Sequence, residues 1–173
     1  MEGTCVMILT FCGHSDFIRN DEYERLLLEY FNTKIGNSSA EFYLGGYGAF
    51  DSFAYECARK YKAGHPLVRL IYVTPYLSAS YQKDRLKYIN DLYDEILYPD
   101  LENVPQKYAI IKRNQWMAEA SDIVVSYVKH GFGGAYKMYA YAKKKGKEIF
   151  NLAEFLCFDA GYPIITLIFY LNK

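Results

Sequence analysis

The stretch that decides the fold is Cys5-Val6-Met7-Ile8-Leu9-Thr10-Phe11-Cys12-Gly13-His14-Ser15-Asp16. Its apolar part, Cys5 to Phe11, is nearly continuous, which is typical of a parallel strand that is covered on both faces. The run ends in a short loop that contains Gly13. Glycine in such a loop lets backbone N–H groups close on an anion at the start of a helix. The stretch therefore predicts a central strand followed by a ligand-binding turn.

Two further glycine segments also follow expected strands. Leu44-Gly45-Gly46-Tyr47-Gly48-Ala49-Phe50-Asp51 follows a strand at 41–44, and His130-Gly131-Phe132-Gly133-Gly134-Ala135 follows one at 122–128. In an open α/β sheet, the loops at the carboxyl ends of the strands line the ligand crevice. A single glycine loop has a purely steric explanation, but three in one architecture indicate a nucleotide-type ligand.

The remainder of the chain alternates between strand and helix patterns. We expect helices at 21–35, 52–62, 83–92, 105–120 and 134–145, and further strands at 67–74, 95–98 and 148–152. This alternation predicts a Rossmann-like, doubly wound α/β fold, with a mostly parallel sheet and helices on both faces. We expect one domain, in which 1–152 form the nucleotide-binding part and 153–173 a C-terminal extension. Within that extension, Ile164 to Leu171 is expected to add a strand.

The charge of the chain is balanced. Its 173 residues include 20 Lys and Arg and 20 Asp and Glu, so the formal net charge is zero. This balance argues against direct nucleic-acid binding, because a sequence-independent binder needs a basic face. The cluster formed by Lys143, Lys144, Lys145 and Lys147 is interpreted as a solvated helix end whose cations suit the helix dipole.

Cysteine spacing and hydropathy limit the class of protein further. The four cysteines, Cys5, Cys12, Cys57 and Cys157, form no CxxC pair and no zinc-ligand spacing. No apolar run reaches the roughly 20 residues that span a bilayer, and the N-terminus has no signal-peptide pattern. We therefore expect a cytoplasmic protein with reduced thiols and without a metal, a cofactor or a membrane partner.

The order of the motifs resembles the SLOG superfamily. The similarity rests on FCGHSD at 11–16, GGYGAFDSFAYECA at 45–58, and RNQWM followed by DIVVSY within 113–127, before the last glycine loop. It extends over about Val6 to Leu152. The superfamily joins LOG-type phosphoribohydrolases with DprA/SMF proteins, and this chain is most similar to its small uncharacterised bacterial members. The resemblance implies a Rossmann-like fold, a homodimer and a nucleotide-derived ligand.

The resemblance also implies where such a ligand would bind. In LOG-type enzymes an arginine on the helix before the fourth main strand helps to hold the nucleotide, and Arg113 has this position. Arg113 either faces the ligand, which we favour, or packs its stem over the edge of the core. The predicted ligand-binding residues are Gly13, His14, Ser15, Asp16, Gly45, Gly46, Tyr47, Gly48, Lys83, Arg113, Gly131, Gly133 and Gly134.

The catalytic motif of the LOG-type enzymes is altered in this chain. Their PGGxGTxxE motif supplies a glutamate for glycosidic cleavage, whereas this chain reads HGFGGAYKMY, with 136–138 at the place of that glutamate. Substitute carboxylates are Asp16, Asp51 and Glu119. Each also has a structural explanation, respectively an Asx-turn, a helix N-cap and an exposed helix position. Whether the chain is an enzyme stays open.

We interpret the chain as a binding module for a nucleotide or a nucleotide-derived small molecule, acting as a sensor or as a sequestering protein. Two alternatives remain. One is an N-glycosidic hydrolase of the phosphoribohydrolase type that acts on nucleoside 5'-monophosphates, which would need a carboxylate near the sugar. The other is a DNA-processing accessory or interaction protein.

Overall fold

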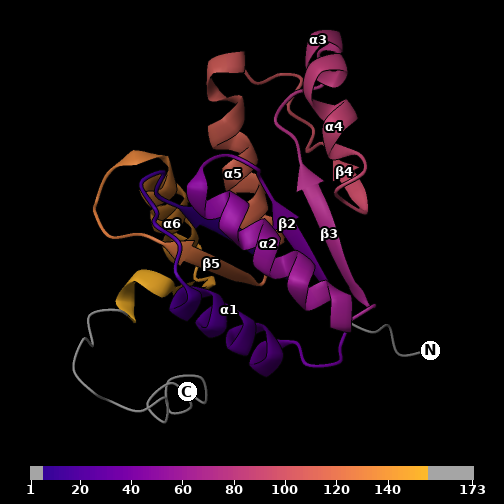
Figure 1. Ribbon diagram of the computed structural model, residues 1–173. Helices are drawn as coiled ribbons and strands as arrows, with labels where there is room; N and C mark the ends of the chain where they lie inside the picture. Colours follow the sequence, from indigo (N-terminus) through magenta and orange to yellow (C-terminus); the bar gives the residue numbers. More distant parts are fainter. Residues whose placement is uncertain (1–5, 156–173) are drawn as a thin grey trace.

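A six-stranded parallel sheet forms the centre of the computed structural model, which describes residues 6–155 (Figure 1). The strands are β1 (Met7–Gly13), β2 (Ala40–Leu44), β3 (Val68–Val73), β4 (Glu95–Leu97), β5 (Ile123–Tyr127) and β6 (Glu148–Asn151). Their order is β4-β3-β2-β1-β5-β6. The order reverses between β1 and β5, so the topological switch point lies at the carboxyl ends of these two strands. The predicted Rossmann-like fold is confirmed.

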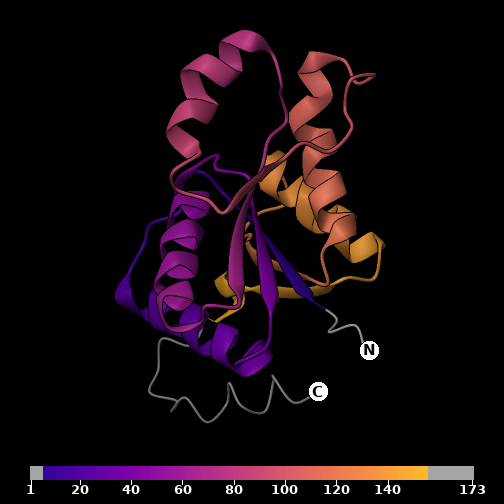
Figure 2. The same cartoon turned by 90° about the vertical axis from the view of Figure 1, so that its right-hand side faces the viewer.

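Helices cover both faces of the sheet. α1 (Asp21–Lys34) and α2 (Ala49–Gly64) lie on one face, and α5 (Ala109–Ala120) and α6 (Gly133–Lys144) lie on the other (Figure 2). Beyond the carboxyl end of β3 stands a further helical segment, 79–89. It comprises α3 (Ala79–Tyr81), the π-helical turn η1 (Gln82–Leu86) and α4 (Lys87–Ile89). Short 3-10 turns form η2 (Gln106–Tyr108) and η3 (Leu152–Glu154).

The two faces of the sheet are packed with different side chains. Under α1 and α2 the core is aromatic, and the rings of Phe11, Phe31 and Phe42 meet with centroids 4.8 to 6.1 Å apart. Under α5 and α6 it is mainly aliphatic and includes Met117 and Met138. Large rings and flexible methionines both fill space at close-packed density, so each face excludes water.

The start of α1 confirms the sequence prediction, but the start of α2 does not. Asn20 caps α1, its Oδ1 accepting the Tyr23 N–H at 2.8 Å. In α2 the N-cap is Gly48, and Asp51 lies in the first turn, so the expectation that Asp51 caps a helix beginning at 52 is wrong. The reason is the backbone of Gly48, whose φ of 101° lets the chain enter the helix earlier.

The structure bears on the expected state of the cysteines and on the expectations about membranes and metals. Cys12 and Cys57 are buried free thiols, and burial raises the pKa of Cys57 to about 12. Within residues 6–155, no helix is long and apolar enough to cross a membrane. In the same range, no three or more His, Cys, Asp or Glu side chains lie close enough together to hold a metal ion. The strand expected at Ile164 to Leu171, together with Cys5 and Cys157, lies outside the described residues.

Candidate functional site

The three glycine loops meet at the carboxyl edge of the sheet, the edge at which the parallel strands end. A Cβ added to Gly48, in the second loop, would lie 3.9 Å from the Cα of Ser15, in the first. The first loop also contacts the third, because the rings of His14 and His130 stack with centroids 3.6 Å apart. The order of β2, β1 and β5 in the sheet brings these loops side by side.

Three rings, those of His14, His130 and Phe132, form a stack where the first and third loops meet. The His14 ring packs on His130, and the His130 ring packs on Phe132 at 3.9 Å, with an angle of 20° between the ring planes. The exposed fraction increases from 5% at His14 to 69% at Phe132. Burial and the neighbouring His130 lower the pKa of His14, so the base of the stack is neutral at physiological pH. The stack therefore ends in an exposed ring face of the kind on which a nucleobase stacks.

The stack lies directly before the start of α6. Phe132 is the N-cap residue of this helix, and no side chain caps it. A Cβ added at Gly133 or at Gly134 would meet nothing within 4 Å, so the first turn is open. Unpaired N–H groups and the helix dipole make such a terminus favourable for an anion. The exposed ring and the anion-binding terminus are thus adjacent in the chain.

The loop after β5 is held in place from β6. Asn151 accepts the Val128 N–H at 3.0 Å and donates to the Val128 carbonyl at 3.1 Å. A shallow hollow of about 540 Å³, here named the β5 hollow, opens beside this loop. Its lining includes the rings of His130, Tyr136 and Tyr139. A fixed loop, aromatic rings and a hollow therefore occur together at the switch point.

Arg113 is enclosed in the protein. It is 1% exposed, and its Nη1 donates to the carbonyl oxygens of Gly45 at 3.0 Å and Val73 at 2.7 Å. The ring of Tyr47 lies over it at 5.3 Å, and desolvation lowers its pKa. Its Nε has no hydrogen-bond partner among the described residues. In this structure Arg113 joins the carboxyl ends of β2 and β3.

Asp51 is also largely enclosed, near Arg113. It is 8% exposed, and its Oδ2 accepts the Tyr47 N–H at 2.9 Å. Desolvation raises the pKa of Asp51 to about 6, against the opposing effects of that hydrogen bond and of the Arg113 charge. The carboxyl group therefore changes its charge close to neutral pH.

The raised pKa predicts a pH-dependent difference in stability between the wild-type protein and Asp51→Asn. The folded protein keeps the Asp51 proton up to about pH 6, whereas the unfolded chain releases it near 3.8. Between these values the folded state binds more protons, so the stability from this group falls as pH rises. The free energy of unfolding of the wild type, relative to the variant, should decrease by roughly 3 kcal/mol across this window. Urea unfolding at several pH values measures it, and a constant difference would contradict the assignment.

The other predicted site residues are divided between the two edges of the sheet. Ser15, Asp16 and Gly131 are exposed in the loops of the carboxyl edge, and Lys83 is exposed on the 79–89 segment. Glu119 lies elsewhere, at the end of α5 near the amino edge, where Lys145 pairs with it at 2.7 Å. The three candidate carboxylates are therefore not brought together.

The sequence-based site missed His130 and Phe132. The available signal was an aromatic residue between two glycines, in the motif HGFGG. Such a residue is normally explained by a turn, and only the structure shows that it continues a ring stack begun by the first loop.

Comparisons with known proteins support the fold. No family model matches the chain, and no curated protein matches it by sequence. A structural match is DNA processing protein A (DprA) from Streptococcus pneumoniae, with a TM-score of 0.56, 16% identity and 84% of this chain covered. The same protein from Helicobacter pylori, described for its single-stranded DNA binding mode, has a TM-score of 0.56, 17% identity and 96% coverage. This chain shares the DprA fold. It spans 50% of the length of the Streptococcus protein and 79% of that of the Helicobacter protein.

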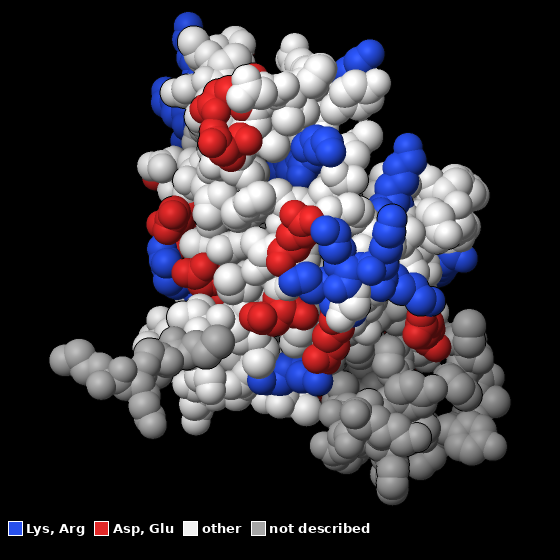
Figure 3. All heavy atoms as spheres, turned by 180° about the vertical axis from the view of Figure 1, so that it is seen from behind, with Lys and Arg blue, Asp and Glu red and all other residues white. Residues whose placement is uncertain are grey.

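The DprA likeness corrects the expectation about nucleic acid. The neutral net charge was taken to argue against direct nucleic-acid binding, yet a protein of this fold binds single-stranded DNA. The argument was wrong because net charge averages over the whole surface. Figure 3 shows basic side chains gathered on part of the face covered by α5 and α6, with acidic side chains beside them. A neutral chain therefore still presents local cationic groups.

Proposed function

We propose that the carboxyl edge of the sheet binds single-stranded nucleic acid and that the chain is a DNA-processing accessory protein. The observation that carries this proposal is the ring stack that ends on Phe132 directly before the open start of α6. A base stacks on Phe132, while its phosphate accepts hydrogen bonds from the N–H groups of Gly133 and Gly134. The DprA fold, which binds single-stranded DNA in the Helicobacter protein, supports the same class of ligand.

The β5 hollow extends this binding surface. The rings of Tyr136 and Tyr139 lie there with centroids 6.4 Å apart, and Lys129 places a cation at its border. Ring faces stack on any base, and backbone N–H groups contact phosphate without reading base edges. Binding at this surface is therefore expected to tolerate changes of sequence.

Replacing Phe132 with alanine should weaken binding of a single-stranded oligonucleotide by about tenfold, because one base loses its stacking partner. The measurement is the fluorescence anisotropy of a labelled oligothymidylate of about 20 nucleotides, at about 50 mM salt. Leu67→Ala is the matched control, since Leu67 is also an exposed apolar residue, at 60%, but lies before β3 at the opposite edge. Its affinity should equal that of the wild type.

Two results would count against the proposal. If the wild-type protein does not bind the oligonucleotide even at about 50 mM salt, the function is wrong. If Phe132→Ala and Leu67→Ala weaken binding equally, the assignment of Phe132 as the ring on which a base stacks is wrong. Raising the salt concentration to about 200 mM should reduce the affinity, because phosphate contacts release counterions.

A free nucleotide or nucleotide-derived small molecule is the second candidate ligand. The observation in its favour is that one ring platform and one helix terminus together fit a single nucleotide unit. Competition separates the two candidates: displacement of the oligonucleotide by an equal concentration of a mononucleotide would favour the small molecule. Release of free base from nucleoside monophosphates, lost on Asp16→Ala, would instead indicate hydrolysis.

A further inference from the structure

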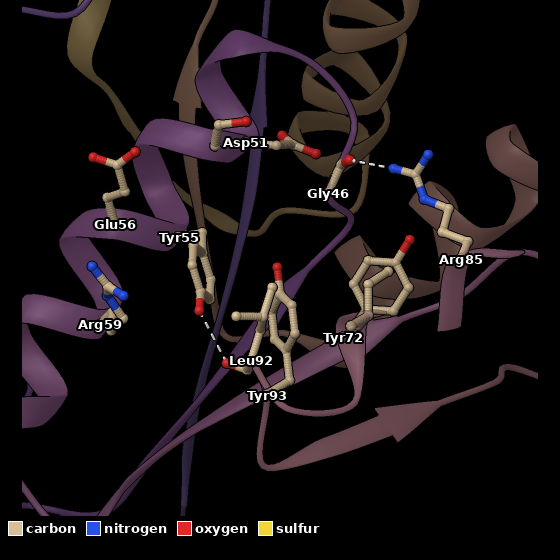
Figure 4. Close-up of a pocket in the computed structure, with 11 residues that line it drawn as sticks. Gly46, Asp51, Tyr55, Glu56, Arg59, Tyr72, Arg85, Leu92 and Tyr93 are labelled. Atoms are coloured by element: carbon tan, nitrogen blue, oxygen red, sulfur yellow. Dashed lines mark hydrogen bonds between the residues drawn. The ribbon is translucent and has the colours of Figure 1, made fainter. Parts of the chain in front are cut away.

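A second hollow, on the α2 side of the molecule, remains without a role in the surface described above. It lies between α2, the end of β3 and the 79–89 segment, and has a volume of about 350 Å³ (Figure 4). The side chains that define its chemistry are Asp51, Tyr55, Arg59, Tyr72, Arg85 and Tyr93. The volume suits a small planar ligand, because small-molecule pockets begin at about 300 Å³.

Aromatic rings form the walls of this pocket. The Tyr93 ring lies between those of Tyr55 and Tyr72, with centroids 4.9 and 5.3 Å away (Figure 4). The Tyr55 hydroxyl donates to the Leu92 carbonyl at 3.1 Å, which fixes one wall against the chain that follows the 79–89 segment. Fixed rings bury a planar ligand without losing much side-chain freedom on binding.

An incompletely paired carboxylate, that of Asp51, lines the pocket. Asp51 is more than nine-tenths buried, and its Oδ2 is used by the Tyr47 N–H. No described residue donates a hydrogen bond to its Oδ1, although Asp51 lines the pocket. Oδ1 is not among the fully enclosed unpaired atoms of the described residues, so it stays accessible as an acceptor for a ligand N–H group.

Two guanidinium groups, those of Arg59 and Arg85, line the pocket (Figure 4). Neither Arg59 nor Arg85 has a carboxylate within ion-pair distance among the described residues, whereas Glu56 is paired with Arg19 at 2.7 Å. Arg85 donates to the Gly46 carbonyl at 3.0 Å and stacks over the Tyr47 ring at 4.7 Å, so it is held in position. Guanidinium groups that line a pocket without a carboxylate partner suit a phosphate.

We propose that this pocket accepts one nucleobase and selects a base with an exocyclic amino group, whose N–H donates to Oδ1 of Asp51. The inference rests on the proposed function, the base belonging either to a bound strand or to a free nucleotide. An amino group at the edge of cytosine meets a carboxylate directly. Thymine presents its ring N–H between two carbonyl oxygens, and these are repelled by the carboxylate.

The test compares oligodeoxycytidylate with oligothymidylate of equal length at about pH 8, where Asp51 is ionised. The two bases have the same ring size; thymine has a carbonyl oxygen in place of the amino group, a proton on N3 and a methyl group on C5, which is why the Asp51 variant is needed to assign the preference. We expect the wild type to bind the cytosine oligonucleotide about tenfold more tightly, as one hydrogen bond to a charged group gives. Asp51→Asn turns the acceptor into an amide donor, so it should abolish or reverse this preference.

A second variant tests the pocket without changing Asp51. Leu92→Trp places a large ring in the pocket lining, where Leu92 is half exposed, and should remove the cytosine preference while oligothymidylate binding persists. Leu77→Trp is the control, because Leu77 is similarly exposed but does not line the pocket. It should keep the preference.

The outcomes separate this inference from the proposed function. Equal affinity of the wild type for the two oligonucleotides overturns the base pocket and leaves strand binding intact. If neither oligonucleotide binds, the proposed function fails, and the pocket is then tested by titrating deoxycytidine and thymidine monophosphates. A preference for the cytosine monophosphate that Asp51→Asn removes assigns the pocket to a free nucleotide, and its absence overturns the pocket.

Discussion

Replacing Arg113 with alanine should lower the free energy of unfolding by about 3 to 5 kcal/mol. The substitution removes a fully buried guanidinium that bonds the Gly45 and Val73 carbonyls, and so leaves both acceptors unpaired. It also removes the cation that acts on the buried Asp51 carboxylate. Each unpaired buried acceptor costs about 1 to 3 kcal/mol, and the cavity adds a packing loss. Urea unfolding monitored by circular dichroism measures the change.

Arg113→Met separates packing from pairing. Methionine restores most of the apolar contacts of the stem but donates no hydrogen bond, so it should recover only the smaller part of the lost stability. If Arg113→Met were as stable as the wild type, the guanidinium would have no structural importance at the ends of β2 and β3. A loss below about 1 kcal/mol for the alanine variant would lead to the same conclusion.

Replacing Gly13 with alanine should destabilise the protein by about 3 kcal/mol, through overpacking. A Cβ at this position would lie 2.2 Å from Cγ and 2.5 Å from Cβ of Phe50, which is completely buried. Atoms so close to the Cα of Phe50 cannot rotate away, so β1 and α2 would have to separate. Thermal or urea unfolding measures the loss.

The matched control is Gly64→Ala at the end of α2, where an added Cβ would meet nothing within 4 Å. This substitution should change stability little. Combining Gly13→Ala with Phe50→Ala should cost less than the sum of the two single changes, because alanine lacks the Cγ and Cδ1 atoms that make the two shortest contacts. Additive losses would show that Gly13 is needed for a reason other than contact with Phe50.

The elements of the fold were largely predictable because each depends on local pattern. The apolar run of β1 and the helix that begins at 21 are visible in the sequence, and both are confirmed. The start of α2 was not predictable, because it depends on a positive φ at Gly48 that a glycine permits but does not require. Periodicity places a helix but not the conformation of the turn before it.

The candidate site was predictable in its loops but less so in its side chains. Parallel strands must end at one edge, and this is why the glycine loops came together as the sequence indicated. The environment of Arg113 depends on which carbonyls β2 and β3 leave unpaired at their ends, and no spacing in α5 encodes that. The exposed face of Phe132 likewise depends on a contact between residues of two loops that are distant in sequence.

The ring stack at the switch point has a thermodynamic consequence for any planar ligand. A side chain that is ordered only on binding costs about 0.5 to 1.5 kcal/mol of affinity. Phe132 is already supported from beneath by His130, and His130 by the buried His14, so its orientation is set before a ligand arrives. The platform is preorganised, so little of the stacking free energy of an incoming base is spent on ordering the ring.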